Sequence, residues 1–276
     1  MAITAANRHL IALDLDGTVV HYDGRIDPEV ATAIRALFDA GHQVVVATGR
    51  SVDSTLPVVE QLRIRPEWVI CCNGAVTLKR DALAHRAYRR QYIEAFDATE
   101  VLKRLASRLI TATFGLETAE GEFLYTQRIP AGTLPTRQRQ VAFDQMFGVQ
   151  ATRVLVVSPD AALEDSLSIV DEIGLSRVTY AVGTRSWLDI APEGVSKESA
   201  LEVVRAQLDI DRSRVFAAGD GNNDIEMLRW AGRHGDAVVM GQATHEVRRA
   251  GSRITGSVEE LGLFHALRDR FPAIVA

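Results

Sequence analysis

Residues 9–18 read HLIALDLDGT, an apolar run that ends in two aspartates, a glycine and a threonine. The run His9–Leu15 has the composition of a strand buried inside a sheet. Because side chains alternate along a strand, Asp14 and Asp16 point the same way if the strand continues that far. Two neighbouring carboxylates repel each other, so one can be an ionised nucleophile or metal ligand while the other holds a proton as a general acid. Taken alone, the motif is also explained by a plain turn after the strand.

Strands and helices alternate at both ends of the chain. Asp27-Pro28 supplies an N-cap and a proline at the first helical position, and Gly41 stands where that helix should end. Further strands are expected at Gln43–Ala47, Trp68–Cys72, Val215–Ala218 and Ala237–Met240, and further helices at Val52–Leu62, Lys197–Leu208, from Asn222 onward and at Val258–Phe271. This alternation predicts an α/β fold with a Rossmann-like, doubly wound parallel sheet, because the connecting helices cover both of its faces.

The middle of the chain has a different pattern, typical of an α+β unit with antiparallel strands. Strands are expected at Tyr88–Ile93, Thr111–Glu117, Phe123–Arg128, Val154–Ser158, Arg177–Val182 and Ser186–Ile190, and helices near Ala95–Leu109 and Ser158–Glu172. The simplest organisation is a core domain of residues 1–82 and 189–276, with an α+β cap domain of residues 83–188 inserted into it.

Polar residues follow four of the predicted parallel strands. The segments are Asp14–Asp16, Thr48–Arg50, Asn73-Gly74 and Gly219–Asp224. Ligands of open parallel sheets bind at the carboxyl ends of the strands, so we expect these segments to form one site. Asp220 and Asp224 are four residues apart at the start of a helix and share one face of it, although an ordinary N-cap turn also explains them. Four carboxylates in one pocket need a cation, and ligands that are all oxygen favour Mg²⁺.

Two further segments suit an anion. Thr48-Gly49 offers a hydroxyl and a backbone N–H near a helix N-terminus, although a helix cap alone would look the same. Lys197 opens a helix, where its charge opposes the helix dipole, which mildly favours a role toward a phosphate or carboxylate over a solvated lysine. Together with the aspartates, these segments outline a site for phosphoryl transfer through an aspartyl-phosphate.

Composition excludes several classes of protein. The 276 residues include 31 Lys and Arg against 36 Asp and Glu, a formal net charge of −5, which argues against a general nucleic-acid or membrane-surface binder. Cys71 and Cys72 are the two cysteines, too close together for ordinary disulfide geometry, and we interpret them as core residues. With no secretory leader and no long apolar run, the sequence predicts a reducing, cytoplasmic location.

The ordered set of these segments resembles the four motifs of the haloacid dehalogenase superfamily. They are Asp14–Thr18, Thr48–Arg50, Lys197 and Gly219–Asp224. More narrowly, the chain resembles the Cof-type phosphatases, which carry a large α+β (C2-type) cap between the second and third motifs. The segments Asn73–Ala75, Asp189–Lys197 and Met240-Gly241 support this resemblance. It implies a Mg²⁺-dependent phosphatase that hydrolyses small phosphorylated metabolites, such as sugar phosphates, through an aspartyl-phosphate intermediate.

The resemblance also implies a role for each matched residue. Asp14 would be the nucleophile, and Asp16 the general acid and base with its backbone carbonyl on the metal. The expected metal set is Asp14, Asp16, Asp220 and Asp224, the last either a direct ligand or a residue behind the ligands. The expected phosphate or substrate set is Thr48, Gly49, Lys197, Asn223, Arg50 and Asn73, with the role of Arg50 open between a helix anchor and a substrate contact.

Some positions depart from the Cof-type pattern, and some functions stay open. Glu198 replaces the usual glycine, Gln242 the usual asparagine, and Gly251-Ser252 the usual Ala-Asp pair, which argues against a subgroup of known substrate. A phosphomutase, or a phosphate-binding module without turnover, would keep the same residues. A dinucleotide-binding oxidoreductase is disfavoured, because its glycine motif does not follow the first strand.

The oligomeric state is left open between a monomer and a weak dimer. In the cap, Arg86, Arg89 and Arg90 either contact an anionic leaving group or form a solvated basic face, and Trp187 is expected to pack at the hinge.

Overall fold

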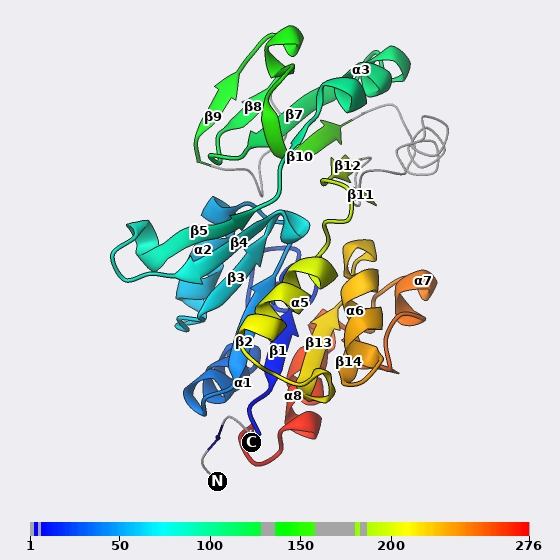
Figure 1. Cartoon of the computed structure of the whole chain (residues 1–276). Helices are drawn as coiled ribbons and strands as arrows, with labels where there is room; N and C mark the ends of the chain where they lie inside the picture. Colours follow the sequence, from blue (N-terminus) through cyan, green and yellow to red (C-terminus); the bar gives the residue numbers. More distant parts are fainter. Residues whose placement is uncertain (1–2, 5–6, 128–135, 158–179, 183–186, 276) are drawn as a thin grey trace.

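Two sheets organise the chain. The computed structural model describes residues 3–4, 7–127, 136–157, 180–182 and 187–275. The first sheet has 8 strands in the order β15-β14-β13-β1-β2-β3-β4-β5, and the second has 7 strands, six of them in the order β11-β12-β10-β7-β8-β9. The second sheet lies beyond one end of the first, above it in Figure 1. The fold-class prediction of an α/β sheet with an inserted α+β sheet is confirmed.

The first sheet is parallel over its six strands from β15 to β3, and an antiparallel hairpin completes one edge. Its strands are β1 (Leu10–Leu13), β2 (Gln43–Ala47), β3 (Trp68–Cys71), β4 (Val76–Arg80), β5 (Tyr88–Ile93), β13 (Val215–Gly219), β14 (Asp236–Val239) and β15 (Arg253–Ile254). The strands are apolar in solid runs because both faces of the sheet are covered. In β1, for example, Ile11 and Leu13 pack into one core, and Leu10 and Ala12 into the core on the opposite face.

Helices cover both faces of this sheet, which confirms the doubly wound prediction. One face carries α1 (Pro28–Asp39), α2 (Val52–Gln61) and α8 (Gly262–Arg270), and the other carries α5 (Lys197–Gln207) and α6 (Ile225–Gly232). A short helix, α7 (His245–Arg248), follows β14. The remaining short 3₁₀ segments are Cys72–Gly74, His85–Ala87, Phe143–Met146, Arg212–Arg214, Asn222–Asp224 and Val258–Glu260.

The second sheet packs one face against a helix and forms the core of the cap domain. The helix is α3 (Thr99–Arg108), and the strands are β6 (Phe96–Asp97), β7 (Thr113–Thr118), β8 (Phe123–Tyr125), β9 (Gln138–Gln140), β10 (Gln150–Val157), β11 (Tyr180–Val182) and β12 (Trp187–Ile190). All the pairings are antiparallel except that of β8 with β9. The predicted helix at Ser158–Glu172 and the side chain of Trp187 lie outside the described residues.

One strand lies in a different sheet from the one expected. Tyr88–Ile93, predicted within the cap, pairs antiparallel with β4 in the first sheet. The physical reason is the short connection after β4, which can only fold back as a hairpin, since a parallel return needs a long crossover. Asp189 and Ile190, predicted in the core domain, pair with β10 in the second sheet. We propose that the chain leaves the core domain after Ile93 and returns to it after Ile190.

A tight turn at the end of β3 has an unusual backbone. Cys72, Asn73 and Gly74 have φ angles of 50°, 52° and 104°, all in the left-handed region. Glycine is required at the third position, because a Cβ on Gly74 would lie 2.2 Å from the backbone oxygen of Ser196. Ser196 is the N-cap of α5, so this turn and the start of α5 form one packed unit. The unit brings Asn73 close to the helix that begins with Lys197.

Candidate active site

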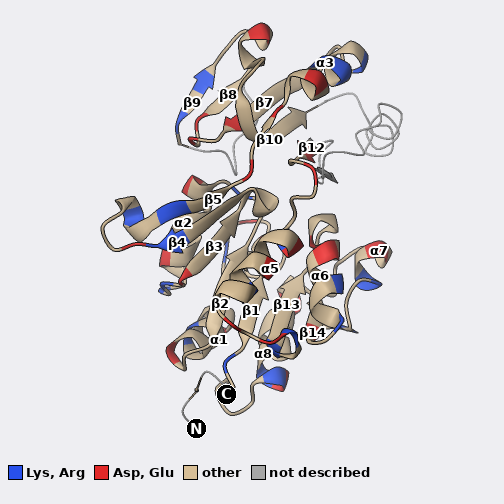
Figure 2. Ribbon diagram, viewed as in Figure 1, with Lys and Arg blue, Asp and Glu red and all other residues tan. Residues whose placement is uncertain are grey.

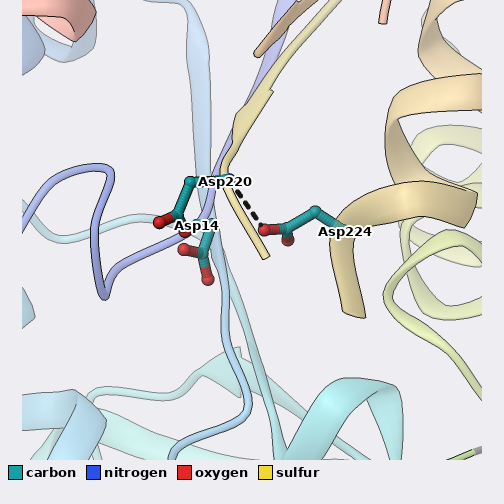
Figure 3. Close-up of side chains that lie close together, drawn as sticks. All are labelled: Asp14, Asp220 and Asp224. Carbon is teal, nitrogen blue, oxygen red and sulfur yellow. Dashed lines mark hydrogen bonds between the residues drawn. The ribbon is translucent and has the colours of Figure 1, made fainter. Parts of the chain in front are cut away.

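The carboxyl ends of β1 and β13 bring three aspartates together. Asp14 follows β1, and its backbone N–H donates to the carbonyl of Ala218 in β13 at 3.0 Å. Asp220 follows β13, and Asp224 lies one turn later, before α6. One carboxylate oxygen from each of the three lies within 4.8 Å of the others, and Figure 3 shows the three side chains converging. The sequence prediction that these strand ends form one cluster is correct for these three residues.

A buried lysine connects two of these carboxylates. The Nζ of Lys197 donates to Asp14 Oδ1 at 2.6 Å and to Asp224 Oδ1 at 2.7 Å, and the lysine is 0% exposed. Burial opposes the ammonium, but Asp14 and Asp224 outweigh it, so the pKa of Lys197 is raised and the charge is kept. Burial, followed by the negative charge of Asp224, raises the pKa of Asp14 well above its usual value. The lysine is therefore the cation that makes this buried acidic cluster tolerable.

Asp224 is engaged through both carboxylate oxygens. Its Oδ1 accepts from Lys197, and its Oδ2 accepts the backbone N–H groups of Asp220 and Gly221 at 3.0 and 2.9 Å. The first of these backbone bonds is the dashed line in Figure 3. Asp224 thus holds the loop that carries Asp220 and positions the lysine, which favours a supporting place behind the other two carboxylates.

Two residues that the sequence analysis did not assign to the site hold Asp220. The hydroxyl of Tyr22 donates to Asp220 Oδ2 at 2.6 Å, and Gln242 Nε2 donates to the same oxygen at 3.0 Å. Gln242 also donates to the carbonyl of Gly17 at 2.6 Å and accepts from the N–H of Val258 at 3.0 Å. In the sequence, Gln242 stands out only because it departs from the Cof-type pattern. No sequence motif indicates that Tyr22 belongs to the site. Together they fix one oxygen of Asp220.

The loop that carries Tyr22 is anchored by a buried histidine. His21 lies 2.7 Å from Asp27 through Nε2 and 2.9 Å from Glu259 through Nδ1, and it is 2% exposed. Burial alone would lower the pKa of His21, but the hydrogen bonds to Glu259 and Asp27 outweigh burial and raise it above 6.5. The hydrogen-bonded imidazole therefore links this loop to two acidic residues.

We expect this anchor to weaken as pH rises. Because the folded pKa is raised, the stability that His21 contributes is complete below pH 6.5 and is lost as pH passes through the folded pKa. In thermal melts, the Tm of the wild type should exceed that of His21→Gln by an amount that shrinks from pH 6 to pH 9. This range begins near the usual histidine pKa and extends above it. His265→Gln, a partly buried position within α8 away from Asp27 and Glu259, serves as the control. A constant advantage across this range would contradict the expectation.

Asp16 occupies a different environment from Asp14. Its carboxylate forms a two-point ion pair with Arg50, with Nε donating to Oδ2 at 2.8 Å and Nη2 bonding Oδ1. The Asp16 side chain is 41% exposed, and it is not part of the buried three-carboxylate cluster. The two carboxylates therefore have separate surroundings, as a nucleophile and a general acid require. The expected contact between the Asp16 carbonyl and a metal stays a prediction.

The residues expected on the phosphate side lie next to one another. The N–H of Arg50 donates to Thr48 Oγ1 at 3.1 Å, which closes the loop after β2. A Cβ on Gly49 would lie 3.1 Å from the side-chain oxygen of Asn73, so the two loops are in close approach. Asn223 Nδ2 donates to Asn73 Oδ1 at 2.9 Å. The loops after β2, β3 and β13 therefore lie together, as the sequence predicts, and the phosphate-binding roles of these residues stay a prediction.

The three arginines that the sequence analysis placed in the cap lie on or beside the β4–β5 hairpin of the first sheet and have protein partners. Figure 2 shows basic residues gathered over the β4–β5 hairpin. Arg86 bonds Glu60, Arg89 lies 3.8 Å from Asp81, and Arg90 donates to the carbonyl of Ala119. These contacts favour the interpretation of a solvated basic face.

The three-carboxylate cluster fits a hard metal ion. Its ligand atoms are all oxygen, its residues are buried, and their spacing allows one ion to reach all three. Asp220 suits this role because Tyr22 and Gln242 hold a single oxygen, Oδ2. In the part of the chain that the structure describes, no helix is long and apolar enough to cross a membrane.

Comparison with known proteins identifies the family. The model of the haloacid dehalogenase-like hydrolases matches residues 11–267, nearly the whole chain. The chain belongs to the haloacid dehalogenase-like hydrolases. Its resemblance to the Cof-type phosphatases with an inserted cap is confirmed, and it is a phosphatase of this superfamily that acts on small phosphate esters.

Relatives within the superfamily differ in substrate. The pyridoxal phosphate phosphatase YbhA of Escherichia coli is 30% identical over 90% of this chain and 93% of its own length. The 5-amino-6-(5-phospho-D-ribitylamino)uracil phosphatase YitU of Bacillus subtilis is 26% identical, covering 95% of this chain and 97% of its own. The solved structure of the subclass IIB sugar phosphatase BT4131 has a TM-score of 0.78 at 20% identity and covers 96% of this chain and 100% of its own. At that identity, the structure supports the fold alone.

Proposed function

We propose that this haloacid dehalogenase-like phosphatase hydrolyses phosphomonoesters of small metabolites such as sugar phosphates, with Asp14 as the nucleophile and Mg²⁺ as the cofactor. The observation that carries the proposal is the Lys197 ammonium, which lies between Asp14 and Asp224 beside Asp220. A fully buried lysine is costly unless it is paired, and here its charge is available to a phosphate that approaches Asp14.

The reaction has two steps, formation of an aspartyl-phosphate and its hydrolysis. An Asp14 oxygen forms a bond to phosphorus while the ester P–O bond breaks, and Asp16 gives its proton to the departing oxygen. A water then attacks the aspartyl-phosphate, Asp16 takes back a proton, and Asp14 is released with inorganic phosphate. Asp16 is well placed for both transfers because its carboxylate is partly exposed. Arg50 orients the Asp16 carboxylate through its hydrogen bonds. The same carboxylate also has to bind the transferred proton and contact the substrate.

The remaining residues bind and neutralise the phosphate. The Thr48 hydroxyl, the Gly49 N–H, the Asn73–Asn223 pair and Lys197 would hold its oxygens, and we call Thr48, Gly49, Asn73 and Asn223 the phosphate cradle. Mg²⁺, held by Asp14 and Asp220 with Asp224 in support and the Asp16 carbonyl, would neutralise the carboxylates and the phosphate dianion. Phosphate-monoester hydrolysis needs accelerations up to about 10²¹-fold, so several donors and a covalent step must act together.

A phosphate-release screen tests this proposal. The purified chain is incubated with and without Mg²⁺ over a panel that includes sugar phosphates, pyridoxal phosphate, phosphoglycolate and ribityl phosphates. We expect Mg²⁺-dependent release from one or more sugar phosphates, with no need for an acceptor. Release that depends on a second sugar would instead indicate a phosphomutase. Phosphate binding without turnover on any ester would indicate a binding module.

Removing the Tyr22 hydroxyl should weaken metal binding. Tyr22→Phe deletes a hydrogen bond to a carboxylate, which should raise the Mg²⁺ dissociation constant about tenfold. At saturating Mg²⁺, kcat should stay close to the wild-type value. Tyr22 contacts Asp220, a proposed metal ligand, and does not contact the phosphate cradle. The measurements are Mg²⁺ titration calorimetry and phosphate release against Mg²⁺ concentration.

Tyr88→Phe is the matched control for this variant. Tyr88 also donates one hydrogen bond, to the carbonyl of Pro66 at 2.8 Å, away from the aspartate cluster. Equal Mg²⁺ constants for the wild type and Tyr22→Phe would show that the tyrosine does not hold Asp220 in place.

A further inference from the structure

Three ionisable residues of the cap domain form a buried cluster on neighbouring strands. Arg153 in β10 pairs with Glu117 in β7, with Nε donating to Oε2 at 3.1 Å, and these residues are 2% and 1% exposed. Arg153 Nη1 also lies 3.8 Å from Asp189 Oδ2 in β12. A guanidinium buried this deeply needs paired charge and hydrogen bonds, and Glu117 and Asp189 supply part of them.

This cluster reaches across the domain boundary at two points. Arg153 Nη1 donates to the backbone carbonyl of Gly49 at 2.8 Å, and Asp189 Oδ2 accepts from Asn73 Nδ2 at 3.3 Å. Gly49 and Asn73 both belong to the phosphate cradle, and they follow β2 and β3 of the core sheet. The cap strands lie beyond the end of the core sheet at which these loops emerge (Figure 1). One cap cluster therefore contacts two of the loops that form the cradle.

The first contact fixes the Thr48 hydroxyl. The carbonyl of the Gly49–Arg50 peptide accepts from Arg153, and the N–H of the same planar peptide donates to Thr48 Oγ1 at 3.1 Å. Because that oxygen already accepts a hydrogen bond, its own hydrogen is directed to another acceptor. In the proposed phosphate cradle, that acceptor would be a phosphate oxygen. The orientation of this donor thus depends on a cap residue more than 100 positions away in sequence.

The second contact fixes the Asn73 amide. A side-chain amide can be turned by half a rotation, which exchanges its donor and acceptor. Asp189 accepts from the nitrogen of Asn73, and Asn223 donates to its oxygen at 2.9 Å, so only one orientation satisfies both neighbours. This orientation in turn sets the position of Asn223, which faces the cradle from the loop after β13.

We propose that Arg153 and Asp189, supported by Glu117, are positioning residues of the cap that hold the phosphate cradle in its binding geometry. The proposal rests on the proposed function, because it concerns the same site. It assigns to the cap domain a part in binding the phosphate itself, separate from any contact with the leaving group. The effect of these residues should therefore be the same for every ester.

The test uses the full chain with Mg²⁺ present. Arg153→Lys keeps a positive charge beside Glu117, but its single nitrogen cannot occupy both the Nε and the Nη1 positions. Asp189→Ala removes the acceptor for Asn73 and decides the question if Arg153→Lys does not fold. The matched control is Arg139→Lys, which alters the exposed Arg139–Glu122 pair of the same domain. The measurements are Tm, calorimetric affinity for inorganic phosphate, affinity for Mg²⁺, and KM and kcat for p-nitrophenyl phosphate and one sugar phosphate.

We expect the phosphate dissociation constant and both KM values to rise about tenfold in Arg153→Lys and Asp189→Ala. This is the effect of losing one charge-assisted hydrogen bond. The Mg²⁺ constant should stay the same, and so should every value for Arg139→Lys. A folded variant with a lower Tm but wild-type affinity for phosphate would overturn the proposal, because the cluster would then only stabilise the cap. If the wild type hydrolyses no ester, the proposed function fails, while the calorimetric phosphate affinities still decide this inference.

Discussion

Asp14→Asn is expected to abolish phosphate release while leaving the fold intact. The asparagine keeps an oxygen at the position that accepts from Lys197 Nζ, so the buried hydrogen bond can persist. It cannot attack phosphorus, because a neutral amide oxygen is not an effective nucleophile. We expect kcat to fall by a factor on the order of 10⁴ or more, in line with the loss of other catalytic nucleophiles. Phosphate release under saturating Mg²⁺ measures this effect.

The stability of this variant gives a second observable. Burial and Asp224 raise the pKa of Asp14, so its ionised form is unfavourable in the folded protein. Removing that charge should leave Tm at or above the wild-type value, as is common for catalytic residues. Asp269→Asn, at an exposed position of α8, is the control. Hydrolysis at the wild-type rate by Asp14→Asn, or acid-stable labelling of another residue in a quenched single turnover, would refute the mechanism.

Lys197→Met should have the largest effect on stability. The change leaves Asp14 and Asp224 buried without the ammonium that both contact. Breaking a buried ion pair by removing one partner typically costs about 3–5 kcal/mol. For a chain of this size, that loss should lower Tm on the order of 10 °C. Phosphate release should also disappear, because the cation between the nucleophile and the phosphate is gone. Thermal melts and phosphate assays measure the two effects.

A second variant separates the two roles of this lysine. In Lys197→Met/Asp224→Asn, one of the stranded carboxylates is neutral, so part of the lost Tm should return while activity stays absent. Lys79→Met changes a partly exposed lysine 3.8 Å from Glu67 and should alter Tm little. An unchanged Tm in Lys197→Met would mean that the ammonium does not stabilise the acidic cluster.

The residues of the aspartate cluster could be predicted from sequence because they follow apolar strands directly. Once the strands are parallel and adjacent, their carboxyl ends share an edge, and Asp14 and Asp220 must approach each other. The same argument placed Thr48 and Asn73 on neighbouring loops. It could not separate Asp14 from Asp16, because the environment of each depends on Lys197 and Arg50, which come from distant parts of the chain.

The contacts that the sequence did not predict are long-range contacts made by side chains. Tyr22 reaches Asp220 and Arg153 reaches Gly49 across separations of 198 and 104 residues, and neither residue stands in a local pattern that signals its partner. The placement of Tyr88–Ile93 was wrong for a related reason. An apolar and basic strand fits either sheet equally well, and the short hairpin connection from β4 decides between them.

The left-handed turn at Cys72–Gly74 has a consequence for how this protein can be engineered. Non-glycine residues held in that conformation carry strain of about 1–3 kcal/mol each, and Cys72 and Asn73 are two of them. The folding reaction supplies this energy, so the Asn73 amide is already oriented when a ligand arrives. Substitutions that relax the turn should make the protein more heat-resistant and a poorer catalyst. Stabilising changes are better placed on the far side of the sheet, in α1 and α8, where thermal robustness and turnover can be improved independently.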